Sequence, residues 1–429
     1  MHSFRAERPD TDMTPLDTAP GKLDLRYVRA QFPAFAETAL QDQAFFENAG
    51  GSYTCAPVID RLTRFYRERK VQPYGAYAAS QTAGAEMDEA RDRLSAMMGV
   101  AAETLSFGPS TTANTYVLAQ AFGEMLRPGD AIIVTDQDHE ANSGPWRRLA
   151  ARGIEIREWR LDPATGHLDP DALSALLDER VKLVAFPHCS NVVGEVNPVA
   201  ELCTMIRSAG AYSCVDGVSY APHGLPDVGA LGADIYLFSA YKTYGPHQGL
   251  MVIRPELAEA LPSQAHYFNA DVPYKRFTPA GPDHAQIAAC AGMADYLDGL
   301  YAIHFPDAPE PGPAGRAAAV HDLMRIHETA LLQPLLDYVS GRNDLRLLGP
   351  SDAEARAPTV ALAHARPGAD LARALAGHGV MAGGGSFYAD RALAAQGIDP
   401  AHGVLRLSFV HYTTRAELDR LINALDQVL

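Results

Sequence analysis

The sequence predicts an α/β protein in which a mostly parallel sheet carries helices on both faces and is followed by a smaller α+β domain. From Leu105 to Ile253, short apolar runs alternate with stretches of helical periodicity, which is the pattern of repeated βα units. A proline-rich break then precedes a long helical pattern and further strand-like runs. In such a sheet, ligands bind at the carboxyl ends of the strands.

The expected elements follow from these runs. The predicted strands of the larger domain include Ala131–Val134, Leu183–Phe186, Ser213–Val215 and Ile235–Phe238, and its predicted helices include Asp169–Asp178 and Val199–Ser208. In the smaller domain we expect a long helix, Ala317–Val339, and strands at Leu345–Leu348, Thr359–Ala363 and Val404–Val410. The predicted boundaries are a flexible leader over 1–22, a segment over 23–55 that joins the smaller domain, the larger domain over 56–304, a linker over 305–316 and the smaller domain over 317–429.

The composition of the chain argues against several classes of function. The chain has 429 residues, and its net charge of −16 argues against the basic surface of a nucleic-acid-binding protein. Five cysteines show neither metal-ligand spacing nor disulfide density, which is typical of a reducing cytoplasm. No apolar run is long enough to cross a bilayer, and the polar start lacks the central apolar stretch of a signal peptide. We therefore expect a cytoplasmic protein with no membrane partner.

One lysine follows a predicted buried strand directly. Ile235–Phe238 leads into a polar turn that carries Lys242, and burial favours the neutral, nucleophilic form of an amine. Asp216 follows the preceding predicted strand. A pyridine aldehyde cofactor needs both groups, an amine to bind its carbonyl and a carboxylate to keep its ring nitrogen protonated. The pair predicts a pyridoxal phosphate site, although alone Lys242 also suits a solvated loop and Asp216 a helix cap.

A predicted helix start supplies a phosphate site. The helix begins near Thr111, after Gly108 and Pro109, and its free backbone N–H groups, its dipole and the hydroxyls of Ser110 and Thr111 favour an anion. Serine and threonine are also the usual caps of a helix. The phosphate assignment therefore depends on the lysine and the aspartate nearby.

A histidine, His139, follows another of the predicted strands. His139 comes after Ala131–Val134, where we expect it to lie over the cofactor ring and to transfer protons. The alternatives are a surface histidine or a metal cluster with neighbouring acids. Those acids are Asp136, Asp138 and Glu140. A metal is the poorer option, because no second histidine stands at a ligand spacing.

Two further polar residues complete the predicted site. Asn191 follows Leu183–Phe186 and either donates to the phenolic oxygen of the cofactor or shapes a turn. Arg406 lies between apolar neighbours in an alternating strand, where it either captures a substrate carboxylate or lies on the polar face of an edge strand. Because these residues each follow or lie in a separate strand, one cleft can collect them.

Motifs spread over nearly the whole chain resemble the class V aminotransferase group of fold-type I pyridoxal phosphate enzymes, and in particular its cysteine desulfurase and selenocysteine lyase branch. These motifs are LDLRYVRAQFPAF, FFENAGGS, DHEANSGPW, SNVVGEVNPV, VDGVSYAPHG, FSAYKTYGPHQG and LRLSFVHYTTRAELDRLI. The resemblance implies a seven-stranded sheet and a homodimer with both active sites near the subunit interface.

The resemblance also implies a role for each site residue. Lys242 is the Schiff-base lysine, Asp216 pairs with the ring nitrogen, and His139 stacks on the ring. Asn191 lies near the ring hydroxyl, and Arg406 holds the substrate carboxylate. The residues implied to hold the phosphate are Ser110, Thr111, Ser239 and Tyr241.

Several positions depart from the family pattern. Ser386, in VMAGGGSFYADR, stands where desulfurases carry a nucleophilic cysteine, and a hydroxyl is hardly ionised at neutral pH and does not readily accept sulfur. Ser219 replaces a family glutamine, and Tyr241 replaces the histidine before the lysine. Gly281, with Ala280, replaces a glycine-threonine pair that reaches the phosphate across the dimer, leaving a backbone donor. Cys55 is the one cysteine near the expected cleft, and it also suits a small buried filler.

Together these observations predict a pyridoxal phosphate enzyme that forms a Schiff base with an amino acid and a carbanion at its α-carbon. Cleavage of a carbon–sulfur or carbon–selenium bond is the favoured reaction, because the resemblance is to sulfur and selenium lyases. An aminotransferase or epimerase uses the same carbanion and stays open. So does a non-catalytic protein that binds the cofactor, as the divergent loop around Ser386 suggests.

Overall fold

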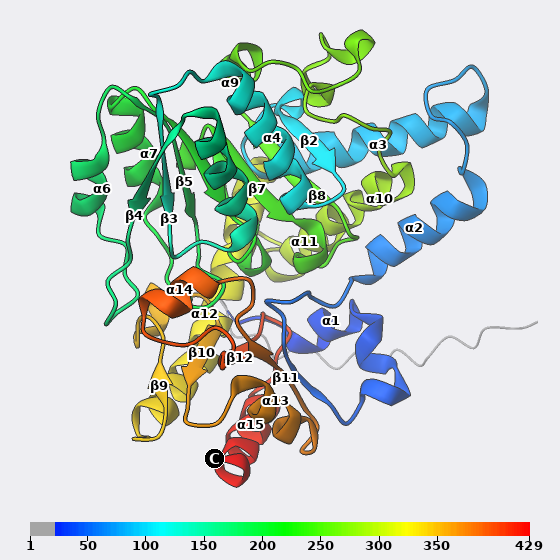
Figure 1. Cartoon of the computed structure of the whole chain (residues 1–429). Helices are drawn as coiled ribbons and strands as arrows, with labels where there is room; N and C mark the ends of the chain where they lie inside the picture. Colours follow the sequence, from blue (N-terminus) through cyan, green and yellow to red (C-terminus); the bar gives the residue numbers. More distant parts are fainter. Residues whose placement is uncertain (1–21) are drawn as a thin grey trace, which may run out of the picture.

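A seven-stranded sheet forms the larger body of the protein in the computed structural model, which describes residues 22–429 (Figure 1). The strand order is β2-β8-β7-β6-β5-β3-β4, and β8 alone runs antiparallel to its neighbours. The strands are β2 (Leu105–Gly108), β3 (Ala131–Thr135), β4 (Glu155–Trp159), β5 (Val181–Pro187), β6 (Tyr212–Asp216), β7 (Ile235–Ser239) and β8 (Gly249–Ile253). The predicted mostly parallel α/β sheet is confirmed. The predicted leader falls, apart from Lys22, outside the described residues.

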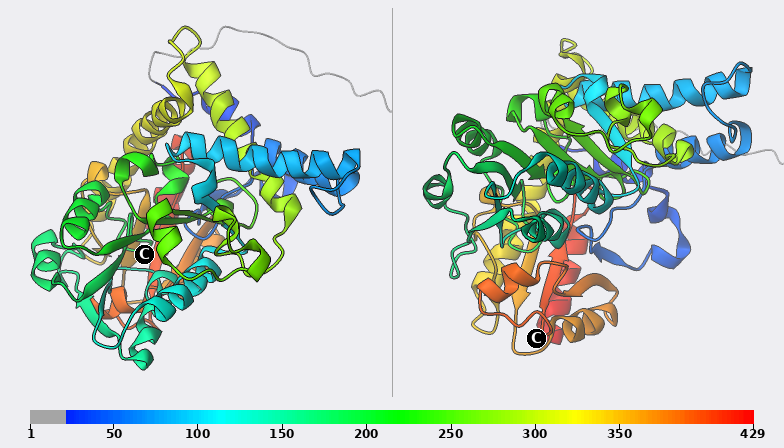
Figure 2. Two further views of the ribbon diagram at one scale, coloured as in Figure 1. Left: turned by 90° about the horizontal axis from the view of Figure 1, so that it is seen from above. Right: turned by 45° about the horizontal axis from the view of Figure 1, so that its top comes forward.

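Helices cover both faces of this sheet (Figure 2). Along β3, Ile132 and Val134 pack with residues of α4 and α5, whereas Ile133 packs in the core on the other face. This alternation reflects the period of two of a strand, and each buried large side chain contributes about 1.5–3 kcal/mol. The helices of the larger body are α2 (Ala56–Glu68), α3 (Ala78–Met97), α4 (Thr111–Met125), α5 (Gly144–Arg147), α6 (Pro170–Leu176), α7 (Val199–Ser208), α8 (Val228–Leu231), α9 (Pro255–Ala260), α10 (His284–Ala289) and α11 (Ala291–His304).

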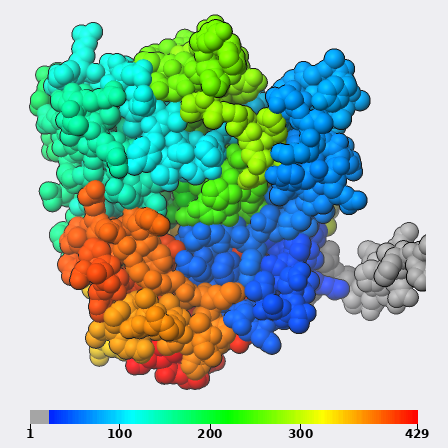
Figure 3. Space-filling model, turned by 45° about the vertical axis from the view of Figure 1, so that its right-hand side comes forward, coloured from blue at the N-terminus to red at the C-terminus, as the bar shows by residue number. Residues whose placement is uncertain are grey.

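A five-stranded sheet forms the smaller body. Its order is β1-β11-β12-β10-β9, with β1 parallel to β11 and the other pairs antiparallel. The strands are β1 (Ala44–Phe46), β9 (Arg346–Leu347), β10 (Thr359–Ala363), β11 (Val380–Gly385) and β12 (Val404–Ser408), and the helices beside them are α1 (Leu25–Ala30), α13 (Gly368–Ala376), α14 (Asp390–Ala395) and α15 (Arg415–Val428). The N-terminal segment, blue in Figure 3, therefore lies against C-terminal segments in orange.

One long helix joins the two bodies. The first half of α12 (Gly312–Ser340) contributes to the core of the larger body, and the second half packs in the core of the smaller body. The predicted linker over 305–316 is therefore too long, because the helix begins at Gly312. Pro313 lies in the first helical turn, where a missing N–H costs nothing. A proline is therefore as compatible with the start of a helix as with a break between domains. The other predicted domain boundaries remain a proposal.

No helix within residues 22–429 is both long and apolar enough to span a membrane.

Candidate active site

A cavity of about 630 Å³ opens at the carboxyl ends of the strands of the larger sheet and is closed by residues of the smaller body. It has two walls. The strand-end wall follows the larger sheet and consists of Ser110, Thr111, His139, Asn191, Asp216, Ser219, Ser239, Tyr241 and Lys242. The small-sheet wall consists of Glu47, Phe387, Tyr388 and Arg406. Most of the predicted site residues thus meet at one cavity, as the shared direction of β2, β3, β5, β6 and β7 requires.

Lys242 lies in a short turn directly after β7 and is buried, with 9% of the residue exposed. Burial and the nearby charge of Arg406 lower its pKa to about 8, although Asp216 and Glu47 act in the opposite direction. With this pKa, about a tenth of the amine is neutral at pH 7, whereas an ordinary lysine is almost fully charged. Lys242 is therefore prepared to act as a nucleophile and as a base.

Asp216 ends β6 and accepts a hydrogen bond from the backbone N–H of Val218 at 2.8 Å. Burial raises its pKa to about 6, while that N–H group and Lys242 favour the ionised form. The carboxylate is therefore mostly ionised at neutral pH. It supplies the buried anion that a protonated ring nitrogen requires.

A second acid, Asp138, also lines the cavity. Asp138 is buried and accepts a hydrogen bond from Nδ2 of Asn142 at 2.8 Å. Burial and the negative charge of Asp216 raise the pKa of Asp138 well above its usual range. Burial and Asp216 therefore favour the protonated form of Asp138. The sequence pattern named Asp138 only as a metal ligand, and within residues 22–429 no three histidine, cysteine or acidic residues gather as a metal site.

His139 follows β3 and lines the cavity. Its Nδ1 accepts the N–H of Ala141 at 3.0 Å, which places the ring proton on Nε2. Burial, Lys242 and Arg406 lower its pKa to about 4, so the ring is neutral at neutral pH. A neutral, flat ring at this edge suits stacking on an aromatic cofactor.

One corner of the cavity is rich in hydrogen-bond donors. The hydroxyls of Thr111 and Ser239 lie 2.7 Å apart, and Ser110 caps α4 by accepting the N–H of Ala113 at 3.1 Å. A Cβ atom at Gly249 would lie 2.5 Å from the backbone nitrogen of Thr111, so glycine permits the close approach of β8 to this helix start. Tyr241 borders the corner and stacks on His247, with ring centres 4.8 Å apart. Hydroxyls and free helix N–H groups are suited to a phosphate.

Asn191 uses its amide differently from the prediction. Its Nδ2 donates to the carbonyl of Phe387 at 2.9 Å, while its buried Oδ1 has no partner. The predicted donation to a ring hydroxyl would therefore compete with this hydrogen bond. The unpartnered Oδ1 is the group of Asn191 that is left to accept a hydrogen bond from a ligand.

Arg406 reaches the cavity from β12 and is almost fully buried. Its Nη2 donates to Oε1 of Glu47 at 2.7 Å, and its guanidinium lies 3.8 Å from the ring centre of Phe387. The sequence analysis missed Glu47. The available signal was a charged residue between the apolar strand Phe45–Phe46 and the glycines of FFENAGGS.

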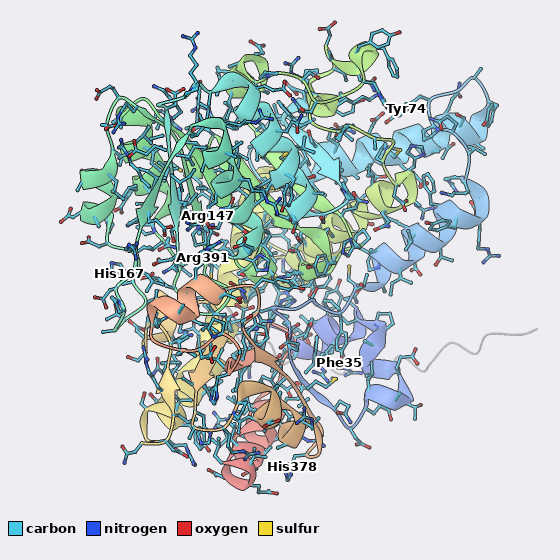
Figure 4. All side chains as sticks on the ribbon, viewed as in Figure 1. Phe35, Tyr74, Arg147, His167, His378 and Arg391 are labelled. Carbon is cyan, nitrogen blue, oxygen red and sulfur yellow. The ribbon has the colours of Figure 1, made fainter. Side chains whose placement is uncertain are left out.

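The loop after β11 reaches the cavity through aromatic residues. Phe387 and Tyr388 both have φ of +56°, which is uncommon for bulky side chains, and Ala389 closes the turn by donating to the carbonyl of Ser386 at 3.0 Å. Ser386 itself does not line the cavity, because the turn presents the two following residues. Arg391 of α14 lies 3.3 Å from Glu140, so an ion pair connects this region to the larger body. Figure 4 shows Arg391 below Arg147 of the larger body.

Gly281 is the other predicted residue outside this cavity. It borders a separate cavity of about 430 Å³ that also includes Phe107, Gly108 and Gln286. The resemblance assigned it a phosphate contact made across a dimer. A contact of that kind depends on a partner subunit, so the role of Gly281 stays a prediction.

All five cysteines of the chain are buried. Burial raises the pKa of the Cys55 and Cys189 thiols to about 12, so neither forms a thiolate readily at neutral pH. Cys189 is the cysteine that lines the cavity, and its Sγ lies 3.4 Å from the carbonyl oxygen of Gly194. The cavity therefore offers no activated thiol among the described residues.

The chain is similar to known proteins over nearly its whole length. The family model for aminotransferase class-V matches residues 44–295 and 318–421. An aminotransferase-like protein of Gibberella zeae is 32% identical over 415 residues, which cover 94% of this chain and 98% of the relative. A cysteine desulfurase of Serratia proteamaculans is 30% identical over 420 residues, covering 94% and 97% of the two chains.

Solved structures agree with the fold. The cysteine desulfurase CsdA of Escherichia coli superimposes with a TM-score of 0.78 at 25% identity, covering 94% of this chain and 98% of the other. A cysteine desulfurase of Thermococcus onnurineus NA1 gives a TM-score of 0.81 at 23% identity, covering 94% and 97%. The latter supports the fold alone.

Proposed function

The chain belongs to the class V aminotransferase family and is a pyridoxal phosphate-dependent enzyme, and from this premise we propose that it cleaves a carbon–sulfur or carbon–selenium bond of an amino acid. The observation that carries the proposal is the meeting of Lys242, Asp216 and Arg406 at one cavity. They provide an amine near neutrality, a buried anion and a guanidinium. The relatives named cysteine desulfurases support the choice of bond.

The residues of the strand-end wall fit the cofactor. Lys242 is the buried amine of this wall, and the carboxylate of Asp216 is ionised despite its burial. The hydroxyls of Thr111 and Ser239 and the start of α4 would hold the phosphate. Asn191 Oδ1 is a buried polar atom without a partner, as expected where a ligand completes a site. We propose that Ser110, Ser219 and Tyr241 complete the contacts.

When bound, pyridoxal phosphate supplies an electron sink for the pair of electrons left at the α-carbon of an amino acid. The protein supplies the remaining groups. Lys242 Nζ takes the α-proton, because its lowered pKa lets it gain and lose a proton near neutrality. The ionised carboxylate of Asp216 would stabilise a protonated ring nitrogen, Arg406 would orient the substrate carboxylate, and neutral His139 would pack on the ring.

The fate of the sulfur follows from the cysteines. Since Ser386 replaces the loop cysteine and the five thiols are buried, we propose that sulfur leaves as sulfide and not as a persulfide on the protein. In this β-elimination the α-proton goes to Lys242, the β-carbon–sulfur bond breaks, and sulfur leaves with the bonding pair and gains a proton. One water is consumed, and the remaining carbon skeleton leaves as a 2-oxo acid and ammonia.

A second reaction has support of its own. The absence of an activated thiol and the similarity to an aminotransferase-like protein favour transamination, or epimerisation, as the alternative. Both begin with the same proton transfer to Lys242 and differ in where the proton returns. A protein that binds the cofactor without catalysis is disfavoured, because the cavity keeps Lys242, Asp216, His139 and Arg406 together.

We further propose a cytoplasmic homodimer. Phe268, which is 67% exposed, borders a cavity that Gly281 also borders, and its neighbour Tyr267 is 89% exposed; exposed aromatic side chains are typical of an interface. The same arrangement would bring Gly281 to the phosphate of the partner subunit. Buried, unpaired cysteines suit a reducing compartment.

The test is a panel of amino acids presented to the holoenzyme. Absorbance reports any response of the cofactor, and separate assays measure sulfide, 2-oxo acid and racemised substrate. Equal amounts of sulfide and 2-oxo acid support elimination, whereas 2-oxo acid that requires an amino acceptor, or racemisation alone, assigns the alternative. No response to any amino acid would contradict an amino-acid-processing enzyme. The Lys242→Ala protein is the control for uncatalysed chemistry.

A further inference from the structure

Glu47 joins the small-sheet wall through strand pairing. It follows β1 directly and forms a parallel bridge with Ser408, the last residue of β12, which is the strand that carries Arg406. The two side chains come from positions 359 residues apart in the chain. This pairing brings an acid and the predicted substrate-binding arginine together at one side of the cavity.

Two of the five N–H groups of the Arg406 guanidinium are already used by other residues of the protein. Nη2 donates to Oε1 of Glu47 at 2.7 Å, and Nη1 donates to the backbone carbonyl of Asn191 at 3.2 Å. Nε is buried and has no partner, and the ring of Phe387 covers one face of the group. A carboxylate that binds arginine through two parallel hydrogen bonds needs two adjacent donors. Glu47 already occupies Nη2, so a carboxylate that uses this nitrogen for one of its two hydrogen bonds competes with Glu47.

The carboxylate of Glu47 is only partly enclosed and only partly hydrogen-bonded. Its side chain is 29% exposed, compared with 3% for Arg406, and its Oε2 has no hydrogen-bond partner. Two glycines make room for the carboxylate, because a Cβ at Gly383 would lie 2.2 Å from Oε2 and a Cβ at Gly50 would lie 2.8 Å from Oε1. Glu47 therefore uses one oxygen on Arg406 and leaves the other unsatisfied, which a bidentate ligand would improve upon.

We propose that Glu47 is a specificity-determining residue that occupies the place of the substrate carboxylate on Arg406, so that a substrate binds by exchanging its own carboxylate for that of Glu47. This inference rests on the proposed action on amino acids. Two carboxylates cannot share one buried guanidinium without repulsion, so Glu47 weakens the binding of every carboxylate ligand. The site then selects amino acids whose side chains add binding energy of their own, and rejects small carboxylates that lack it.

The test measures binding of a small ligand that does not react. Propionate is titrated into the holoenzyme, and its dissociation constant is read by ligand-detected NMR for the wild type, Glu47→Gln and Glu47→Ala. Removing the charge of Glu47 is expected to tighten propionate binding roughly tenfold in Glu47→Gln, and at least as much in Glu47→Ala. Propionamide, which is neutral, should bind all three proteins with similar affinity.

Glu140→Gln is the matched control. Glu140 lines the same cavity but pairs with Arg391 and not with Arg406, and its side chain is 51% exposed. Its loss should change propionate affinity by less than about twofold, since exposed charges are screened. An equal gain in Glu140→Gln would reduce the effect to general cavity charge and overturn the proposal.

Other outcomes separate the inference from the proposed function. Unchanged or weaker propionate binding in both Glu47 variants refutes the exchange, even if amino acids react with the wild type. Tighter binding together with no reaction toward any amino acid supports the exchange and contradicts the proposed reaction. For a reacting amino acid, Glu47→Gln should lower KM and leave kcat within about twofold.

Discussion

The two walls of the cavity are built in different ways. The residues of the strand-end wall lie at the ends of successive strands of one sheet. Burial lowers the pKa of Lys242 to about 8 and raises the pKa of Asp216 to about 6. The small-sheet wall instead pairs its charges internally, as Glu47 neutralises Arg406. The first wall therefore fits a cofactor, and in the proposed exchange the second would be opened by a substrate carboxylate.

This difference has a consequence for specificity. The sheet holds the residues of the strand-end wall in place, so these residues would act in the same way on different substrates. The small-sheet wall includes a turn whose residues Phe387 and Tyr388 both have positive φ, and a carboxylate that one hydrogen bond holds. Under the proposed exchange of carboxylates, substrate choice would therefore depend on the small-sheet wall.

The largest expected effect is in the strand-end wall. Lys242→Ala removes the nucleophile and base, and turnover should fall by at least about a thousandfold, since a positioned general base contributes at this scale. The protein should still fold, because alanine fits where lysine did. Lys182→Ala removes a lysine outside the cavity and should leave turnover unchanged. Equal losses in both variants would show that Lys242 has no special role.

Substitution of the two acids of the cavity, Asp216 and Asp138, should have different effects on turnover. Asp216→Asn keeps a hydrogen-bond acceptor for Val218 but removes the anion, and turnover should fall roughly a hundredfold, since hydrogen bonds between charged groups are the strong ones. Asp138→Asn imitates the protonated state that burial and Asp216 favour, so turnover should change by less than about threefold. Steady-state rates at saturating cofactor measure both. The reverse order would mean that the roles of the two acids have been exchanged.

The small-sheet wall should respond in KM. Arg406→Lys keeps the charge but loses the bidentate fork, so KM for an amino acid should rise roughly tenfold while kcat changes little. A substrate amine without a carboxylate should show no such rise. If kcat falls and KM stays the same, Arg406 acts on the reacting groups and not on the carboxylate.

The pH dependence of cofactor capture tests the environment of Lys242. Only the neutral amine attacks an aldehyde, and with a pKa of about 8 its neutral fraction rises about tenfold between pH 7 and pH 9 and then levels off. Stopped-flow absorbance of the apoenzyme mixed with pyridoxal phosphate measures this rate. A rate that keeps rising through pH 10 would indicate an ordinary lysine.

The same shift predicts the stability of the apoenzyme. Between about pH 8 and pH 10.5 the unfolded chain holds a proton on Lys242 that the folded chain lacks. The contribution of Lys242 to the free energy of unfolding therefore increases with pH over this window. Urea denaturation of the wild type and of Lys242→Met should show the difference.

The sequence predicted the strand-end wall because each of its residues follows an apolar strand. Parallel strands bring their carboxyl ends to one edge of the sheet. The parallel arrangement alone therefore predicts that Asp216 and Lys242 lie close together. The small-sheet wall was predicted only in part. Glu47 meets Arg406 through pairing of β1 with β11 and of β11 with β12, and no local pattern specifies contacts between such distant segments.

Two other differences have local causes. The linker prediction was too long because Pro313 favours the first turn of a helix as well as a break. Ser386 was placed at the cavity by its position in the motif, yet the turn with positive φ at Phe387 and Tyr388 directs those residues to the cavity. Backbone conformations of this kind are rare for aromatic residues, so composition does not predict them.

Reduction of the holoenzyme with sodium borohydride, followed by peptide mapping, tests the central assignment most directly. It fixes the cofactor on the lysine that carries it. We predict a yellow protein in which the reduced cofactor is found on the peptide with Lys242 and on none of the other lysines, which are Lys22, Lys70, Lys182 and Lys275. A label on one of those residues, or a protein that stays colourless with added pyridoxal phosphate, would contradict the account.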